Sequence, residues 1–66
     1  MNAFEIIKFG SNLLRKNKIS TNILDSEILL SKTLNKSREK ILTNLDQKIS
    51  KNDIFVFQKY LIRRSN

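Results

Sequence analysis

The sequence contains no cysteine, no histidine and no proline, and it has only one glycine. Without cysteine or histidine the chain cannot build a zinc finger, a redox pair, a thiol nucleophile or an imidazole base. A single glycine also excludes a glycine-rich phosphate-binding loop. With 66 residues the chain can form one small domain with a packed core, but not a deep cofactor cleft as well. We therefore do not expect an enzyme made of this chain alone.

Long apolar runs are absent too. No stretch approaches the roughly 20 apolar residues that a membrane-spanning helix needs. No signal-peptide core follows Met1. These absences predict a soluble protein of the cytoplasm that has no membrane partner.

Positive charge is what the sequence has in excess, because thirteen Lys and Arg against six Asp and Glu give a net charge of +7. Such a balance attracts nucleic acid, an acidic protein face or anionic lipid. Codon bias offers a different explanation: the nine Ile, nine Lys and eight Asn are all specified by A/T-rich codons. The basic residues also form no stripe along the chain, so direct nucleic-acid binding is not favoured.

Apolar residues recur at helical spacing along most of the chain, which predicts an all-α fold. We expect a helix over residues 3–16, a second over 23–34, a short third over 38–42 and a last one over 51–64. Residues 43–48 are typical of a loop, with Leu45 and Ile49 as apolar anchors. A break in the first helix would raise the count by one. The prediction is a small bundle of four to five short helices with neighbours largely antiparallel.

Two helices carry more apolar residues than one face can hold. The second helix is apolar nearly all the way round, which predicts a central element surrounded by the others. The last helix presents Ile54, Phe57 and Leu61 as its main face, and Phe55 and Ile62 are expected to widen it.

The first helix has two residues that its pattern does not explain. Gly10 lies inside the apolar stripe, where glycine costs about 1 kcal/mol relative to alanine. Its position predicts the close approach of another helix. Phe4 lies outside the stripe, so it either covers the end of the bundle or faces a partner.

Carboxylates are few and none is placed for catalysis. Asp25 and Glu27 are two residues apart on one helix and so face different directions. Glu27 projects among apolar neighbours, where an unpaired carboxylate is expensive. We expect an arginine to pair with it, and the candidates are Arg38 and Arg64.

Three segments together resemble a known family pattern. Residues 23–30 read ILDSEILL and residues 34–38 read LNKSR, which resembles the "LDAE-x-LL … LG-x-x-R" stretch in the N-terminal domain of bacterial release factor glutamine methyltransferases (HemK, also called PrmC). Residues 57–64, FQKYLIRR, are similar to the family's helix that ends in "RR". Ser26 replaces the usual Ala and Asn35 replaces the usual Gly. Both changes are mild, because Ser is small and Asn tolerates the left-handed helix cap.

The resemblance implies a function for a longer parent protein. The parent would transfer a methyl group from S-adenosylmethionine to the glutamine of the GGQ loop in peptide-chain release factors. Residues 1–64 would be the helical substrate-recognition domain, and residues 65–66 would begin the linker to an absent catalytic domain. The cofactor would bind in that domain, so this chain is expected to hold no cofactor, no metal and no catalytic residue. Its partners would be the release factor and its own catalytic domain.

Residue roles follow from the same resemblance. Arg63 and Arg64, at the end of the last helix, and Phe4 are candidates for contact with a partner. A further set of polar residues is expected to have a structural role that ties the second helix to its neighbours: Asp25, Glu27 and Arg38.

Two other functions compete with this interpretation. The chain could be a free-standing basic helical module that binds nucleic acid, which would make its affinity fall steeply with salt. It could also dimerise through an exposed apolar strip that includes Phe4 or Phe55.

Overall fold

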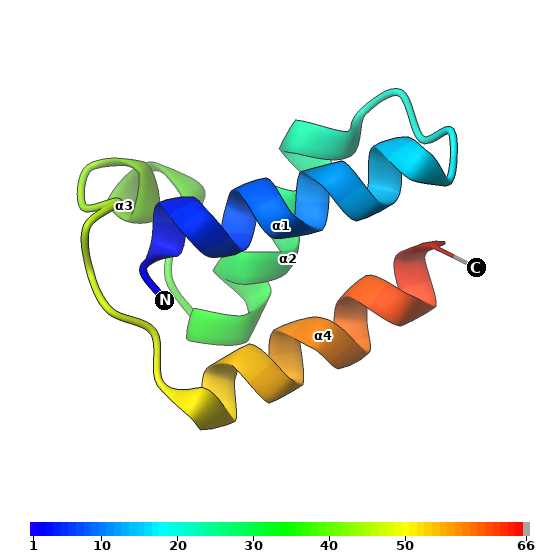
Figure 1. Cartoon of the computed structure of the whole chain (residues 1–66). Coiled ribbons are helices and arrows are strands. Elements are labelled where there is room, and N and C mark those ends of the chain that lie inside the picture. The colour runs from blue at the N-terminus through cyan, green and yellow to red at the C-terminus, as the bar shows by residue number, and fades with distance from the viewer. Residues whose placement is uncertain (66) are drawn as a thin grey trace.

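The computed structural model describes residues 1–65, and over this range the protein is all-α with four helices (Figure 1). The helices are α1 (Ala3–Lys16), α2 (Asn22–Leu34), α3 (Arg38–Leu42) and α4 (Lys51–Ser65). The first helix is continuous, so the lower of the two predicted helix counts is confirmed. Residues 65–66 are expected to begin a linker; Ser65 is the last residue of α4, and residue 66 lies outside the described residues. None of the four helices is long and apolar enough to cross a membrane.

The start of α1 is closed by a capping box and by the distant loop. Asn2 accepts a hydrogen bond from the Glu5 amide at 2.9 Å, and the Glu5 carboxylate accepts one from the Asn2 amide at 2.9 Å. The next two free amides of the first turn donate to loop carbonyls, Ala3 N to Gln47 O at 3.0 Å and Phe4 N to Leu45 O at 3.1 Å. All amides of this helix terminus are thereby satisfied.

Gly10 is the contact point of three helices, as its place in the apolar stripe predicts. A Cβ atom at this position would lie 2.8 Å from Phe57 Cζ on α4 and still closer to Ser26 Oγ on α2. Ser26 is fully buried, and its hydroxyl donates to the Ile7 carbonyl at 2.8 Å. Ser26, which stands where the resembled pattern has alanine, therefore makes a buried hydrogen bond between α1 and α2.

The helix α2 contacts the other three, so its predicted central place is confirmed. The prediction that it is surrounded on all sides is wrong. Three of its apolar side chains are 40–61% exposed: Ile23, Leu24 and Ile28. A chain of this length has too few residues to cover a central helix completely. The helix ends as expected at Asn35, which adopts the left-handed conformation with φ 54°.

The remaining elements are a short helix, a loop and α4. The Ser37 side chain caps α3 by accepting a hydrogen bond from the Lys40 amide at 3.2 Å. Ile49 is buried and Leu45 packs against the core, as predicted for the loop anchors. On α4, Phe57 and Leu61 are buried, but Phe55 and Ile62 are 56% and 57% exposed. The expectation that these two widen the core face is wrong, because they lie on the side of α4 that no other helix covers.

The direction of the helices sets which ends meet. Figure 1 shows that α1 and α4 run in the same direction, with α2 crossing behind α1. The C-terminal ends of α1 and α4 therefore lie on the same side of the molecule, and α3 and the loop lie on the other (Figure 1). The prediction of antiparallel neighbours does not describe this pair, because α1 and α4 are neighbours in space but not along the chain.

Candidate partner-binding surface

Metal-ligating side chains do not cluster in the part of the chain that the structure describes. Within residues 1–65 no group of three or more His, Cys, Asp or Glu side chains lies close enough to hold a metal ion. Two of the six carboxylates are engaged in ion pairs with arginines. What the molecule offers instead is an apolar surface and a basic one.

An apolar groove lies between α1, α2, α3 and the loop that follows α3. It has a volume of about 250 Å³, and its lining residues are Phe4, Ile7, Lys8, Ser11, Ile23, Glu27, Leu42 and Leu45. We call it the α1–α2–α3 groove. A second hollow, of about 60 Å³, lies between α1 and α4.

The rim of the α1–α2–α3 groove carries apolar side chains that are largely open to solvent. Phe4 is 53% exposed, Ile23 is 61% exposed and Leu42 is 37% exposed. Ile7 lines the groove and belongs to the buried core. Exposed apolar side chains gathered around a hollow are typical of a protein-binding site. Phe4 therefore lies on the rim of the groove.

One wall of the groove is held by an ion pair between α2 and α3. Arg38 Nε lies 2.9 Å from Glu27 Oε1 and donates a hydrogen bond to it. The Glu27 side chain is only 15% exposed, while that of Arg38 is 42% exposed. Arg38 is thus the arginine that pairs with Glu27, and this ion pair joins α3 to α2.

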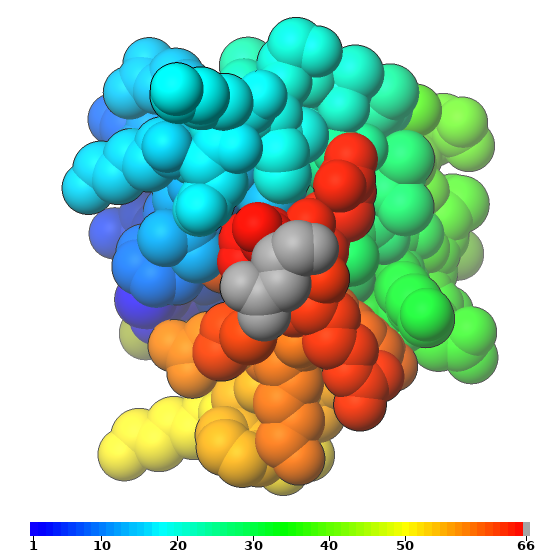
Figure 2. Space-filling model, turned by 90° about the vertical axis from the view of Figure 1, so that its right-hand side faces the viewer, coloured from blue at the N-terminus to red at the C-terminus, as the bar shows by residue number. Residues whose placement is uncertain are grey.

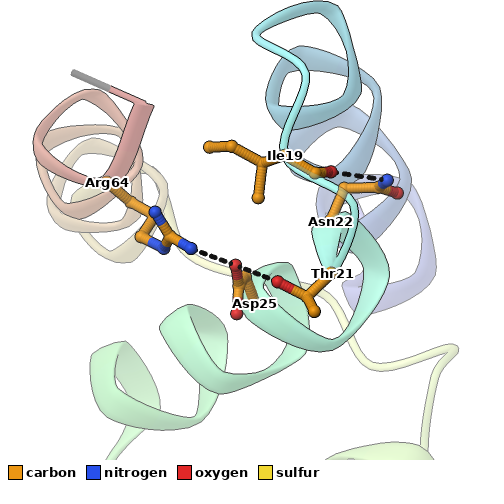
Figure 3. Close-up of polar contacts among 5 residues, drawn as sticks. All are labelled: Ile19, Thr21, Asn22, Asp25 and Arg64. Carbon is orange, nitrogen blue, oxygen red and sulfur yellow. Dashed lines mark hydrogen bonds and ion pairs between the residues drawn. The ribbon is translucent and has the colours of Figure 1, made fainter.

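Arg64, the other arginine considered for Glu27, pairs with Asp25 instead. Its Nη2 atom lies 2.8 Å from Asp25 Oδ2, and the same carboxylate oxygen accepts a hydrogen bond from Thr21 Oγ1 at 2.8 Å (Figure 3). This contact joins the last turn of α4 to the first turn of α2 (Figure 3). The guanidinium of Arg64 is engaged within the fold, although its side chain is still 46% exposed. Arg63, the next residue back along α4, is exposed.

Sequence reasoning missed most of the groove. The apolar pattern places Ile23 in a surrounded helix and gives no role to Lys8 or Leu42, yet all three line the groove. The all-round apolar pattern of residues 23–34 contained the signal. Such a pattern fits a surrounded helix and also fits a helix with one apolar face left open, and the periodicity does not separate the two.

The chain has a clear relationship to known proteins. A family model described as the PrmC N-terminal domain matches residues 5–66. This chain belongs to that family. It is also 37% identical over 60 residues to a protein named bifunctional methyltransferase from Rickettsia felis (strain ATCC VR-1525 / URRWXCal2). That alignment covers 91% of this chain but only 11% of the relative, and no solved structure matches the chain.

The family assignment agrees with the segments on which the resemblance rests. The PrmC N-terminal domain model spans the ILDSEILL, LNKSR and FQKYLIRR segments together. In the structure, these segments supply Asp25, Glu27, Arg38 and Arg64, which form the two ion pairs. The polar residues shared with the family pattern therefore connect α2 to α3 and to α4.

Proposed function

We propose that this domain positions a peptide-chain release factor for a protein-glutamine methyltransferase and does no chemistry itself. Under this proposal the recognition domain comprises residues 1–64, and residues beyond them begin a linker to a catalytic domain. The methyl acceptor is the glutamine of the release factor's GGQ loop. The protein works in the cytoplasm, where release factors act.

The single observation that carries the proposal is the α1–α2–α3 groove in a member of the PrmC N-terminal domain family. Its volume of about 250 Å³ is below the roughly 300–1,000 Å³ of small-molecule sites. It suits one or two apolar side chains of a protein partner, which is how binding hot spots are usually filled. The similarity to part of a bifunctional methyltransferase supports a parent enzyme that supplies the reaction.

The α1–α2–α3 groove is a poor match for S-adenosylmethionine. The cofactor's adenosine, carboxylate and sulfonium groups require several convergent polar partners, which such sites provide together with an apolar lining. In the α1–α2–α3 groove, the Glu27 carboxylate is already engaged by Arg38 and the Ser11 hydroxyl donates to the Lys8 carbonyl. We therefore assign the cofactor to the proposed catalytic domain.

Nuclear magnetic resonance of the isotope-labelled chain tests the proposal. The labelled domain is titrated with a bacterial release factor that carries the GGQ loop and, separately, with S-adenosylmethionine. We expect the release factor to shift or broaden amide signals of residues around the groove, and the cofactor to leave the spectrum unchanged. Cofactor binding with a micromolar constant would overturn the assignment of roles.

Matched variants distinguish binding at the groove from non-specific hydrophobic binding. Phe4→Ala and Ile23→Ala remove apolar side chains from the groove rim, and both residues are more than half exposed. The controls are Phe55→Ala and Ile28→Ala, which remove side chains of the same type that are 56% and 48% exposed elsewhere. Release-factor binding should weaken at least several-fold in the first pair only. Equal weakening in both pairs would show that the groove is not the site.

A further inference from the structure

The net charge of +7 is distributed unevenly over the fold. Two arginines are neutralised in the pairs with Asp25 and Glu27. The other four carboxylates lie in α3, in the loop and in the first turns of α1 and α4, where four lysines balance them. The carboxylates are Glu5, Glu39, Asp46 and Asp53, and the lysines are Lys36, Lys40, Lys48 and Lys51.

Six of the thirteen basic residues are thus matched by the six acidic ones. The other seven basic residues account for the net charge of +7. Four of them lie in the last turns of α1 and α4 and in the turn after α1: Arg15, Lys16, Lys18 and Arg63. We call these four residues the basic end. The other three lie apart from one another along the chain: Lys8, Lys32 and Lys59.

The parallel course of α1 and α4 brings the basic end together. Residues 13–20 and 60–65 lie side by side on the face that Figure 2 shows, on the side where both helices finish in Figure 1. Arg15, Lys16, Lys18 and Arg63 are all exposed. The Asp25 carboxylate, which lies beside the last turn of α4, is already paired with Arg64. Residues 13–20 and 60–65 include no Asp or Glu, so these two segments present only positive side-chain charge.

The backbone at Lys18 adds a second, independent observation. Lys18 has φ 62°, the left-handed conformation that glycine adopts at lower cost than any other residue. Its amide donates to the Arg15 carbonyl at 2.9 Å, and the Ile19 amide donates to the Leu14 carbonyl at 3.0 Å. This is the hydrogen-bond pattern of a Schellman cap, where glycine is the usual residue. A lysine in this position places a charge at the basic end at a cost in stability.

We propose that the basic end is a docking surface for an acidic face of a protein partner. Residues 13–20 and 60–65 contain one aromatic side chain, Tyr60, and Lys32 Nζ already lies 4.8 Å from the centre of its ring, so the basic end has no free row of aromatic rings on which nucleic-acid bases could stack. The neighbouring Ile62 is 57% exposed, and an apolar side chain beside exposed cations is typical of protein interfaces. The inference rests on the proposed function, because the acidic face is assigned to the release factor.

Charge at this end raises the rate of association more than it strengthens the final complex. A surface of one sign increases the association rate constant by roughly 10- to 1,000-fold, and salt suppresses the effect. The unaltered domain should therefore bind the release factor about tenfold or more faster at about 50 mM than at about 200 mM salt.

A matched pair of triple variants tests the docking surface. Arg15→Gln, Lys16→Gln and Lys18→Gln remove three charges from the basic end. Lys36→Gln, Lys40→Gln and Lys51→Gln remove three charges from the lysines that the other four carboxylates balance, outside the basic end. Only the first triple should lower the association rate constant, by about tenfold at low salt, and flatten its salt dependence. If both triples lower the rate equally, or neither does, the proposal is wrong.

Lys18→Gly separates a binding role from a structural one. The substitution keeps the left-handed turn, removes one charge and relieves the backbone cost. A docking role predicts a higher melting temperature together with slower association. Unchanged association in this variant, together with unchanged association in the first triple, would overturn the proposal.

The outcomes distinguish this proposal from the proposed function. If the unaltered domain does not bind the release factor at all, both fail. If it binds and all variants associate alike, only the docking surface fails. If a short RNA duplex binds more tightly than the release factor and the first triple abolishes that binding, the basic end contacts phosphates and the assignment to an acidic protein is wrong.

Discussion

Substituting Gly10 by alanine should destabilise the domain even though alanine is the better helix former. The gain in helix propensity is about 1 kcal/mol. The added Cβ atom would lie 2.8 Å from Phe57 Cζ and closer still to Ser26 Oγ. Phe57 is 1% exposed, so its ring has little room to move away. Overpacking costs about 1–3 kcal/mol, and because Phe57 and Ser26 are both buried we expect the upper part of that range, about 2–3 kcal/mol, which leaves a net loss of about 1–2 kcal/mol.

The Ser26 hydroxyl can avoid the new methyl group only by leaving the Ile7 carbonyl. That buried hydrogen bond is 2.8 Å long and contributes about 0.5–1.5 kcal/mol. Ser26→Ala removes the hydroxyl and so should relieve part of the strain that Gly10→Ala creates. The two substitutions should therefore be less damaging together than the sum of their separate effects, by at least about 0.5 kcal/mol.

Thermal and urea unfolding followed by circular dichroism measure all four proteins of this cycle. For a domain of this size, 1 kcal/mol corresponds to a shift in melting temperature of about 4–8 °C. Gly10→Ala alone should thus melt about 5–15 °C lower than the unaltered chain. A higher melting temperature, or strictly additive effects in the double variant, would refute the reasoning, because it would show that the contact of α1 with α2 and α4 is not tight.

The remaining predictions concern the helix ends. Lys18→Gly should raise the free energy of unfolding by about 0.5–1 kcal/mol, because glycine adopts the left-handed conformation without strain. Urea denaturation measures this free energy, and a lower value than in the unaltered chain would contradict the assignment of a backbone cost. Asp25→Asn should speed hydrogen exchange in the last turn of α4 around Arg64, while exchange in the middle of α1 stays unchanged; uniform acceleration would argue for global destabilisation. A double-mutant cycle on Glu27 and Arg38 should give a coupling free energy below about 1 kcal/mol that falls as salt is added, because the Arg38 side chain is largely exposed. A larger coupling that does not depend on salt would show that the pair behaves as a buried ion pair.

The features that the sequence predicted are local ones. The buried stripe of α1 follows from apolar spacing within one helix, and Gly10 stands out because it interrupts that stripe. The caps at Ser37 and Asn35 depend only on neighbouring residues. Such signals need no knowledge of how the helices are arranged.

The features that it did not predict depend on arrangement and on size. Arg64 pairs with Asp25, which is 39 residues away in the sequence, because α4 ends beside the start of α2. Ile23 and Phe55 stay exposed because none of the four helices within residues 1–65 covers them. The basic end exists because α1 and α4 run in the same direction, which periodicity along the chain cannot reveal. The candidate site is therefore mainly a product of tertiary arrangement.

The backbone contacts between the first residues and the loop have a consequence for how the domain opens. Ile49 N donates to Met1 O, and Ala3 and Phe4 donate to the carbonyls of Gln47 and Leu45. These bonds close a ring of more than forty residues, and ring closure of that length is slow compared with pairing adjacent helices. The loop and the first turn of α1 should therefore separate together, as one unit, before the rest of the bundle unfolds. The same event would dismantle the groove wall that contains Phe4 and Leu45.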